Sequence, residues 1–242
     1  LICRTPEILS KKVRSKISLF TNVPEDSVVN GLDVESVYEV PLMFHQENLD
    51  NIIMSYLQMW TGSPKLQPWI DLIEKYKNPQ DNVDIAFIGK YVTHLDSYES
   101  LKEALLHGGI ANRLKVKLHY IDSELLTPEN AFEKLESMDG VLVAPGFGER
   151  GMEGKITAIQ IARKSNIPFF GICLGMQMAI VEFARNVIGI TEANSGESRP
   201  DHAENVIDLM PEQEGNLETG GTMRLGSQIT DLKKGSIIAR MY

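Results

Sequence analysis

Residues 168–177 read Pro168-Phe169-Phe170-Gly171-Ile172-Cys173-Leu174-Gly175-Met176-Gln177, a short apolar run followed by a cysteine between two glycines. The glycines stand two residues before and two residues after Cys173, which is the spacing of a nucleophile elbow. In such a turn from strand to helix, the flanking residues approach each other too closely for a Cβ atom. The nucleophile itself takes a strained backbone conformation. The pattern therefore predicts an exposed Cys173 thiol at a helix N-terminus, where the helix dipole favours a thiolate.

The same spacing has a second interpretation, because most free cysteines are small buried hydrophobic residues. A cysteine in that role faces an apolar core. An elbow cysteine instead stands above the end of a sheet and faces solvent. The two interpretations therefore predict different positions for Cys173.

The composition excludes two classes of function. The 242 residues include 24 Lys and Arg against 33 Asp and Glu, a net charge of −9, which argues against a sequence-independent nucleic-acid surface. No apolar run reaches the roughly 18 residues of a membrane span, and no signal peptide is apparent. Cys3 and Cys173 lie far apart in the sequence and suggest no disulfide framework. We therefore predict a cytoplasmic protein that binds neither nucleic acid nor membrane.

From residue 83 onward, predicted strands alternate with predicted helices. This alternation predicts an α/β fold with a doubly wound, mostly parallel sheet. The strands are expected at Val83–Ile88, Val116–Ile121, Gly140–Val143 and Ile167–Ile172, and then at Val206–Met210, Gly220–Leu225 and Ile237–Tyr242. The helices are expected from Asp96 to Gly108-Gly109, from an N-cap at Thr127, at Lys155–Ser165 and at Gly175–Val187.

A glycine-rich loop, Pro145–Gly154, follows the predicted strand that ends at Val143. Its composition fits a flexible surface loop, and it also fits a loop that presents a backbone N–H to a developing oxyanion. The carboxyl ends of parallel strands share one edge of the sheet, where sites form. We therefore expect the strand ends at Val143 and Ile172 to be adjacent, which brings this loop beside Cys173.

The first 82 residues differ from the rest, and the chain begins directly on a predicted strand, as if within a domain. Strands are expected at Leu1–Arg4, Lys16–Phe20 and Ser36–Leu42, followed by an amphipathic helix at Leu49–Trp60 and a short helix at Trp69–Lys77. About 60 residues bury too little surface to be comfortably stable alone. We therefore expect an incomplete layer with exposed apolar surface at residues 1–60, followed by a linker at 61–82.

The residues around Cys173 carry a family resemblance. Gly171–Gln177 is similar to the nucleophile segment of class I glutamine amidotransferases. Together with Ala179, Glu182, the run 184–187, the run 193–195 and Glu197, it resembles the glutaminase domain of the CTP synthase family. The resemblance implies that residues 83–242 are a glutaminase domain truncated at its C-terminus. It also implies that residues 1–60 are the C-terminal part of a P-loop-type α/β synthetase domain.

The resemblance assigns roles around the elbow. Cys173 attacks the amide carbon of glutamine and forms a thioester. The oxyanion is held by the N–H groups of Gly146 and Leu174, and Pro145 replaces the first of two glycines found in relatives at this loop. The substrate glutamine is held by four further residues, namely Gly175, Met176, Gln177 and Glu197.

The resemblance also implies nucleotide sites. Lys16 corresponds to a lysine that contacts UTP or CTP, and Leu32, Asp33 and Val34 correspond to a segment that contacts ATP. Arg150, with Thr222 and Arg224, corresponds to a site where GTP activates the family. The complete enzyme aminates UTP to CTP with ATP, Mg²⁺ and ammonia from glutamine, and it forms homotetramers and filaments. The residues that bind the metal and most of the ATP are not in this sequence.

Two alternatives from other classes remain open. One is a cysteine hydrolase that shares the elbow, and the other is a non-catalytic assembly module. The family's catalytic His-Pro-Glu motif matches none of the five histidines here, and His202 is the nearest histidine downstream of Cys173. We therefore expect the chain alone to leave glutamine intact, while its Cys173 thiol alkylates faster than a free cysteine.

Overall fold

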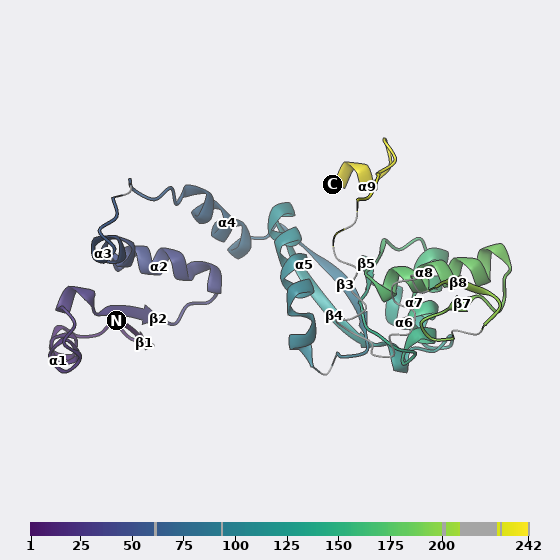
Figure 1. Ribbon diagram of the computed structural model, residues 1–242, viewed down its shortest axis with the longest axis horizontal. Helices are drawn as coiled ribbons and strands as arrows, with labels where there is room; N and C mark the ends of the chain where they lie inside the picture. The colour runs from purple at the N-terminus through teal and green to yellow at the C-terminus, as the bar shows by residue number, and fades with distance from the viewer. Residues whose placement is uncertain (61, 93, 200–201, 209–226, 228, 242) are drawn as a thin grey trace. The chain divides into compact units, whose positions relative to one another are not determined.

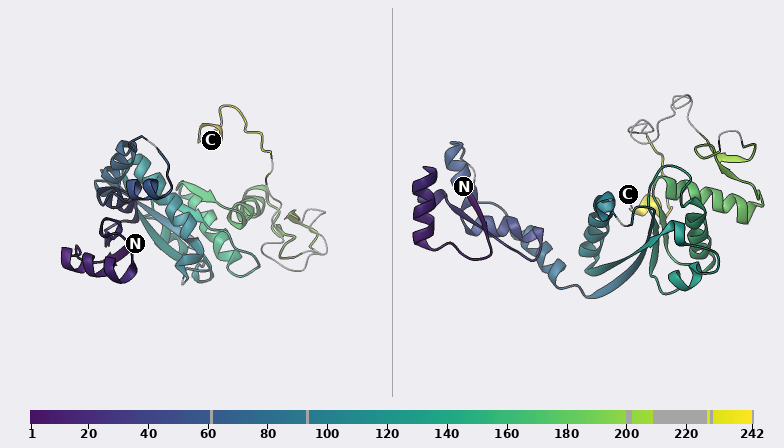
Figure 2. Two further views of the ribbon diagram at one scale, coloured as in Figure 1. Left: turned by 60° about the vertical axis from the view of Figure 1, so that its left-hand side comes forward. Right: turned by 90° about the horizontal axis from the view of Figure 1, so that it is seen from below.

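The computed structural model describes residues 1–60, 62–92, 94–199, 202–208, 227 and 229–241, and the chain divides into two compact units (Figures 1 and 2). The first unit comprises residues 1–82 and 106–115, and the second comprises residues 83–105 and 116–242. Each unit is described by itself. In the described residues, no helix is long and apolar enough to cross a membrane.

The first unit contains a small parallel sheet of two strands with helices around it. Strands β1 (Ile2–Thr5) and β2 (Val29–Leu32) pair in parallel, with Ile2 opposite Val29. The chain between them forms helix α1 (Lys11–Thr21) and the 3₁₀ turn η1 (Glu25–Ser27). After β2 come the 3₁₀ turn η2 (Val37–Glu39) and helices α2 (Val40–Gln46), α3 (Leu49–Tyr56) and α4 (Gln67–Lys77).

Two strand predictions in this unit were wrong. The stretch Lys16–Phe20 lies inside α1, whose N-cap Ser10 accepts a hydrogen bond from the Val13 N–H and so stabilises the first turn. The stretch Ser36–Leu42 forms η2 and the start of α2, because Pro41 occupies the first turn, where proline favours a helix. The predicted strand at Leu1–Arg4 and the helices at Leu49–Trp60 and Trp69–Lys77 are confirmed, with shifted ends.

Strand β2 was not predicted, because Asn30 and Gly31 interrupt its apolar pattern. The expected exposure of apolar side chains at residues 1–60 is confirmed. Leu19 is 79% exposed, Phe20 77% and Trp60 98%. A sheet of two strands has too little area to cover these side chains.

The second unit is built on a four-stranded sheet with the order β4-β3-β5-β6. Its strands are β3 (Asp81–Gly89), β4 (Leu114–Asp122), β5 (Gly140–Val143) and β6 (Phe169–Gly171). The β3–β5 and β5–β6 pairs are parallel, and Val143 lies opposite both Ile88 and Gly171. The expected adjacency of the two strand ends is therefore confirmed. The chain reverses its direction of travel across the sheet at β3 and β5, where ligand sites form in such folds.

Helices cover both faces of this sheet, as predicted for a doubly wound fold. On one face, Ala86, Ile88, Val141 and Val143 pack in the main core with helices α6 (Ala131–Leu135), α7 (Met152–Lys164) and α8 (Leu174–Phe183). On the other face, Phe87 and Leu142 pack against Tyr98, Leu101 and Leu105 near and within helix α5 (Glu99–Asn112). Alternate residues of β3 thus face opposite layers, which explains its continuous apolar run.

Several boundaries differ from the predictions. Helix α5 follows the 3₁₀ turn η3 (Leu95–Tyr98) and continues through Gly108-Gly109 to Asn112. Helix α6 follows the 3₁₀ turn η4 (Ser123–Leu125) and begins at Ala131, because the Thr127 carbonyl closes a separate turn that precedes it. Helix α8 passes directly into a π-helical turn at Ala184–Ile188, a rare feature that is often found at functional sites.

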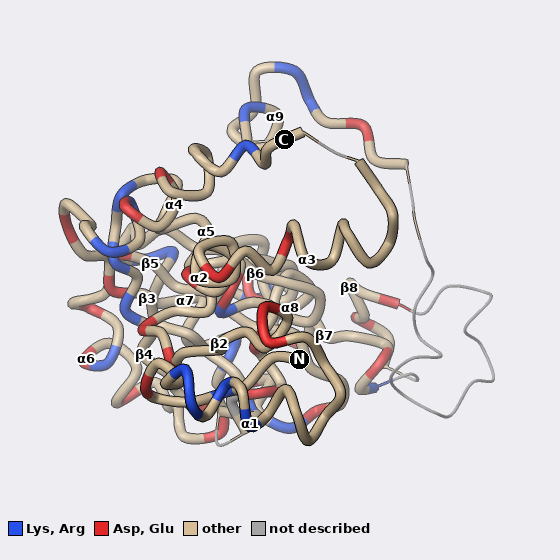
Figure 3. The backbone as a smooth tube through the Cα atoms, turned by 90° about the vertical axis from the view of Figure 1, so that its left-hand side faces the viewer, with Lys and Arg blue, Asp and Glu red and all other residues tan. Residues whose placement is uncertain are grey.

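The last described elements are short. Strands β7 (Asn194–Ser195) and β8 (Asn205–Ile207) pair in parallel. Strand β8 overlaps the strand predicted at Val206–Met210, of which residues 209 and 210 lie outside the described residues. The strand predicted at Ile237–Tyr242 is wrong, because Ile238–Met241 form helix α9, in whose first turn the Ala239 N–H donates to the Ser236 hydroxyl. The strand predicted at Gly220–Leu225 lies outside the described residues. Acidic and basic residues are interspersed along most of the backbone (Figure 3).

Candidate active site

Cys173 occupies the turn between β6 and α8 and serves as the N-cap residue of that helix. Its backbone angles are φ 54° and ψ −112°. A positive φ is uncommon for a residue with a Cβ atom and persists only where the surroundings impose it. The side chain is exposed, so the prediction of a strained, solvent-facing cysteine is confirmed, and the buried alternative is wrong.

The two flanking glycines are required by close backbone contacts. A Cβ atom on Gly171 would lie 2.6 Å from the carbonyl carbon and oxygen of Gly175. A Cβ atom on Gly175 would overlap the carbonyl group of Val143 at the end of β5. Both contacts are with backbone atoms, which cannot rotate away as a side chain can. The elbow therefore fits tightly against the carboxyl ends of β5 and β6.

The loop after β5 lies beside this elbow. The Ile172 N–H donates to the Val143 carbonyl at 3.0 Å, which continues the β5–β6 pairing up to the nucleophile. Gly146 has φ +154°, and a Cβ atom there would lie 2.9 Å from Cε of Lys90. Within the described residues, the Gly146 N–H donates to no protein acceptor. It is therefore available to a ligand, as the predicted role of oxyanion donor requires.

Two buried lysines hold the carbonyl groups of this loop. Lys90, which follows β3, donates to the carbonyl oxygen of Phe147 and, at 3.3 Å, to that of Gly148. Lys155 of α7 has a fully buried side chain and donates to the Ala144 carbonyl at 2.8 Å. Burial lowers the pKa of Lys90, and the nearby Arg150 lowers it further.

Burial also lowers the pKa of Lys155, to about 8. The positive charge of Lys90 acts in the same direction, and a thiolate at Cys173 acts against it. The sequence analysis missed both lysines. The position of Lys90 directly after an apolar strand was an available signal, since sites gather at strand ends. Lys155 offered no such signal, because an isolated lysine in a helix is usually solvated.

Gln177 and Glu197, both predicted to hold the substrate glutamine, lie in contact with each other. The Gln177 side-chain amide donates to the Glu197 carboxylate at 3.2 Å, and the Gln177 side-chain oxygen is buried without a partner among the described groups. Gln177 lies one turn into α8, since its N–H donates to the Cys173 carbonyl. The Glu197 N–H is held by the Ser195 hydroxyl at 3.3 Å. Gln177 on α8 and Glu197 in the loop after β7 therefore meet beside the helix that begins at the nucleophile, with acceptor groups available to a polar ligand.

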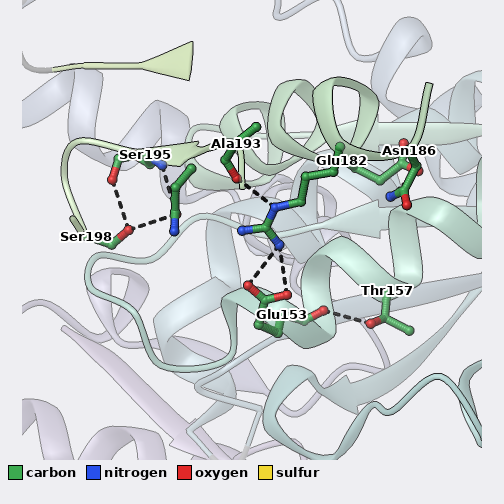
Figure 4. A network of polar contacts seen from close by, with 9 residues as sticks. Glu153, Thr157, Glu182, Asn186, Ala193, Ser195 and Ser198 are labelled. Atoms are coloured by element: carbon green, nitrogen blue, oxygen red, sulfur yellow. Dashed lines mark hydrogen bonds and ion pairs between the residues drawn. The ribbon is translucent and has the colours of Figure 1, made fainter. Parts of the chain in front are cut away.

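Arg185 fixes the segment before Glu197 through contacts with Ala193 and Glu153, both labelled in Figure 4. The Arg185 guanidinium donates to the Ala193 carbonyl at 2.7 Å and to both oxygens of Glu153 at 3.0 Å. Ser198 adds a hydrogen bond to the Ser195 carbonyl at 3.0 Å. These contacts connect the first turn of α7, the end of α8 and the β7 segment.

Comparisons with known proteins agree with this geometry. Residues 93–242 match the family model described as Glutamine amidotransferase class-I. The chain belongs to the class-I glutamine amidotransferase family. The predicted resemblance around Cys173 is thereby confirmed at the level of the family, and the hypothesis of an unrelated cysteine hydrolase is no longer needed.

The other matches extend to the first unit. Residues 1–59 match the model described as CTP synthase N-terminus. The chain is 49% identical to CTP synthase of Syntrophus aciditrophicus and 51% identical to that of Geobacter metallireducens, in each case over 100% of this chain and 45% of the relative. It therefore spans about 45% of the length of these relatives. A solved glutaminase domain of Trypanosoma brucei CTPS with bound acivicin is 39% identical, with a TM-score of 0.52, over 57% of this chain and 54% of that one.

In this member of the amidotransferase family, the other predicted glutamine-site residues lie at the elbow. Leu174 and Gly175 begin α8 and are buried, whereas Met176 is 54% exposed. The Leu174 N–H follows the nucleophile directly, as an oxyanion donor must. The structure thus brings Gly146, Leu174 and Cys173 to the shared edge of β5 and β6.

The predicted GTP-site residues are only partly described. The Arg150 guanidinium carbon lies 5.6 Å from the centre of the Tyr91 ring, and its Nη1 pairs with Glu124 at 3.1 Å. Arg150 therefore stands at the outer end of the same glycine-rich loop. Thr222 and Arg224 lie outside the described residues.

The predicted nucleotide residues of the first unit do not all come together. Leu32, Asp33 and Val34 line a cavity of about 400 Å³ whose other walls are mostly apolar. Arg4 lines the same cavity and pairs with Asp33 at 3.3 Å. Lys16 is not among the residues that line this cavity. It lies on α1 with its ammonium 6.0 Å from the Phe20 ring.

The described residues place neither a histidine nor a metal cluster at Cys173. Within the described residues, no histidine hydrogen-bonds to Cys173; the His119 ring is engaged by Asp84 at 2.6 Å and the His202 ring by the Glu204 N–H at 3.2 Å. The described residues also contain no cluster of three side chains suited to hold a metal ion. The site therefore consists of a thiol, backbone donors and the Gln177–Glu197 pair.

Proposed function

We propose that this chain provides the glutamine-hydrolysing site of a CTP synthase. The observation that carries the proposal is the strained, exposed Cys173 at a helix N-terminus, next to an unpaired Gly146 N–H. The 45% share of its relatives' length makes the whole reaction, amination of UTP to CTP, an inference from similarity. Residues 83–242 are assigned to the glutaminase domain, 61–82 to a linker and 1–60 to the synthetase domain.

The chemistry begins at the thiolate. The Cys173 Sγ attacks the side-chain amide carbon of glutamine, and the carbonyl π electrons move to oxygen, where the N–H groups of Gly146 and Leu174 donate to the oxyanion. The carbonyl double bond then re-forms as the C–N bond breaks, and the nitrogen takes a proton from water and leaves as ammonia. Water hydrolyses the resulting thioester to glutamate. Removal of one oxyanion donor typically costs a factor of about 100 to 1,000 in rate.

Glutamine recognition is assigned to the pair on and beside α8. The Glu197 carboxylate accepts hydrogen bonds from the α-ammonium of the substrate, and Gln177 holds that carboxylate in place through its side-chain amide. The buried side-chain oxygen of Gln177 offers the substrate a further acceptor. Gly175 and Met176, at the start of α8, are assigned to the base of the glutamine site. The Arg185 contacts keep the Glu197 loop at this position.

Nucleotide binding is assigned to the remaining predicted residues. The apolar walls of the cavity at Leu32, Asp33 and Val34 fit a nucleobase, which supports ATP as its ligand. Lys16 is assigned to UTP or CTP, and Arg150 with Thr222 and Arg224 to the activator GTP. Mg²⁺ has no candidate cluster among the described residues, so no step is assigned to it. We place the enzyme in the cytoplasm as a homo-oligomer, in which the exposed apolar side chains of residues 1–60 are covered.

The proposal is tested with acivicin, the compound bound in the related glutaminase domain. The chain is incubated with acivicin, and the adduct is located by intact mass and peptide mapping. We expect one adduct per chain at Cys173, with none in C173S. Cys3, the other free thiol, is the internal reference. Equal modification of Cys3 and Cys173, or alkylation of Cys173 by iodoacetamide without any acivicin adduct, contradicts the proposal.

A further inference from the structure

Lys155 is a buried cation without a buried anion to balance it. Its side chain is fully buried, and its ammonium has one hydrogen bond, to the Ala144 carbonyl at 2.8 Å. Within the described part of the chain, no carboxylate pairs with it. Buried lysines are almost always paired, because an unpaired charge in the interior is costly. Among the described residues, the ammonium therefore has the Ala144 carbonyl as its hydrogen-bond partner and no paired carboxylate.

The surroundings make the charge still more costly. Lys155 is the fourth residue of α7, near the positive end of the helix dipole. Lys90, on the loop after β3, adds a second positive charge, and Arg150 and Glu124 in turn act on Lys90. The anion that acts on Lys155 is the thiolate of Cys173, from the β6–α8 elbow. Attraction between two charges is mutual, so the ammonium favours the thiolate as much as the thiolate favours the ammonium.

The hydrogen bond of Lys155 also fixes the loop that carries the oxyanion donor. The Ala144 N–H donates to the Ile88 carbonyl at 2.9 Å, and Lys155 binds the Ala144 carbonyl, so both polar backbone groups of Ala144 are engaged. Pro145 has no N–H with which to anchor the loop itself. Lys90 holds two carbonyls further along the loop, those of Phe147 and Gly148. The carbonyls thus point to the lysines, and the Gly146 N–H stays free.

We propose that Lys155 is a positioning residue for glutamine hydrolysis, whose ammonium is the counter-charge of the Cys173 thiolate and whose N–H orients the loop that presents the Gly146 N–H. This inference rests on the proposed function for the identity of the substrate. Its electrostatic part concerns the thiol alone. The charge coupling to the thiol and the positioning of the loop are therefore tested with different reagents.

The electrostatic part is tested by the pH profile of iodoacetamide alkylation, read at Cys173 and Cys3 in the same sample. K155M removes the charge and the donor and keeps an apolar stem, whereas K155Q removes only the charge. K164M is the matched control, because Lys164 is an exposed lysine on the same helix. We expect Cys173 to alkylate several-fold more slowly near neutral pH in K155M and K155Q than in the unmodified chain, because the thiolate loses its counter-charge. The profile of Cys3, and both profiles in K164M, stay unchanged.

The positioning part is tested by acivicin labelling. The pH is chosen so that the rate of Cys173 alkylation has reached its plateau in every variant, because the thiolate is then fully formed in all of them. K155Q is expected to label at nearly the rate of the unmodified chain, and K155M at least about tenfold more slowly, since its loop lacks an anchor. Far-UV circular dichroism verifies that each variant is folded. Coincident alkylation profiles in folded K155M, K155Q and unmodified chain overturn the proposal. If the profiles shift but the unmodified chain takes no acivicin, the proposed function fails while the charge coupling stands.

Discussion

Replacement of Lys155 by methionine is expected to stabilise the second unit near pH 7, and this effect is expected to diminish as the pH rises. The pKa of Lys155 falls from 10.5 to about 8 on folding, chiefly through burial. Between these two values the unfolded chain binds a proton that the folded chain has lost. The free energy of unfolding of the unmodified chain therefore rises with pH in this window. K155M has no titrating side chain at this position, so this contribution to the pH dependence of its free energy of unfolding is absent.

The magnitude follows from the two pKa values. Below about pH 8 the folded chain carries the buried charge in full, and a lowering from 10.5 to about 8 corresponds to roughly 3 kcal/mol. Near pH 9.5 the remaining cost is about 1 kcal/mol. K155M also orphans the Ala144 carbonyl, which costs about 1–3 kcal/mol at any pH. This cost is the same at both pH values. It therefore cancels when the effect of K155M on the free energy of unfolding near pH 9.5 is subtracted from its effect near pH 7, which leaves about 2 kcal/mol.

The assay is urea unfolding of the unmodified chain and K155M near pH 7 and near pH 9.5. Far-UV circular dichroism follows the helices and strands of both units. Tryptophan emission follows the first unit only, because Trp60 and Trp69 both lie in it, and its transition serves as the internal control. We expect the advantage of K155M in the dichroism transition to shrink by about 2 kcal/mol at the higher pH. The emission transition is expected to be the same in both proteins.

Two results would refute this reasoning. If K155M is less stable than the unmodified chain by the same amount at both pH values, the ammonium is not desolvated as its burial implies. If the tryptophan transition shifts with the substitution, the effect of Lys155 is not confined to the second unit. A stabilised K155M with a less reactive Cys173 would show that the lysine is kept for chemistry at the expense of stability.

Three further outcomes are expected. R163M should destabilise the second unit by about 1–3 kcal/mol in urea, because it removes the exposed Arg163 that pairs at 2.7 Å with Glu182, whose side chain is 1% exposed; R163M/E182M should recover most of that loss, and a neutral R163M would show that the buried Glu182 carboxylate does not depend on Arg163. G175A should abolish acivicin labelling, because the new Cβ overlaps the Val143 carbonyl, and normal labelling would show that the elbow tolerates the shift. The chain alone should release no ammonia from glutamine, since no described histidine hydrogen-bonds to Cys173; release that disappears in C173S would show that another residue serves as the base.

The elbow could be predicted from the sequence because its constraints are local. The spacing of Gly171 and Gly175 around Cys173 encodes a backbone turn, and the strands at β3 and β5 are long or wholly buried apolar runs. The stretch Lys16–Phe20 was misread for the opposite reason. Its apolar residues are exposed on α1, so no burial pattern distinguished a helix from a strand.

The roles of Lys90 and Lys155 could not be predicted, because they depend on burial by distant elements. Lys155 is 11 residues from the carbonyl that it binds, and Lys90 is 57 residues from the loop carbonyl of Phe147. Neither lysine stands in a recognisable motif. Glu197 was assigned to the glutamine site only through the family resemblance, since a carboxylate in a polar loop is usually solvated.

The central claim is that Cys173 attacks the side-chain carbonyl carbon of a glutamine. It is tested most directly with a γ-glutamyl thioester of N-acetylcysteamine, because a thiolate leaving group needs no proton from an acid. Attack forms the bond from Cys173 Sγ to the carbonyl carbon and expels the N-acetylcysteamine thiolate. The account predicts a γ-glutamyl adduct on Cys173, formed at least about tenfold faster than on Cys3, a difference of about 1.4 kcal/mol in barrier, and absent in C173S. Equal acylation of the two cysteines, or equal acylation of Cys173 by an acetyl thioester that lacks the amino acid, would contradict it.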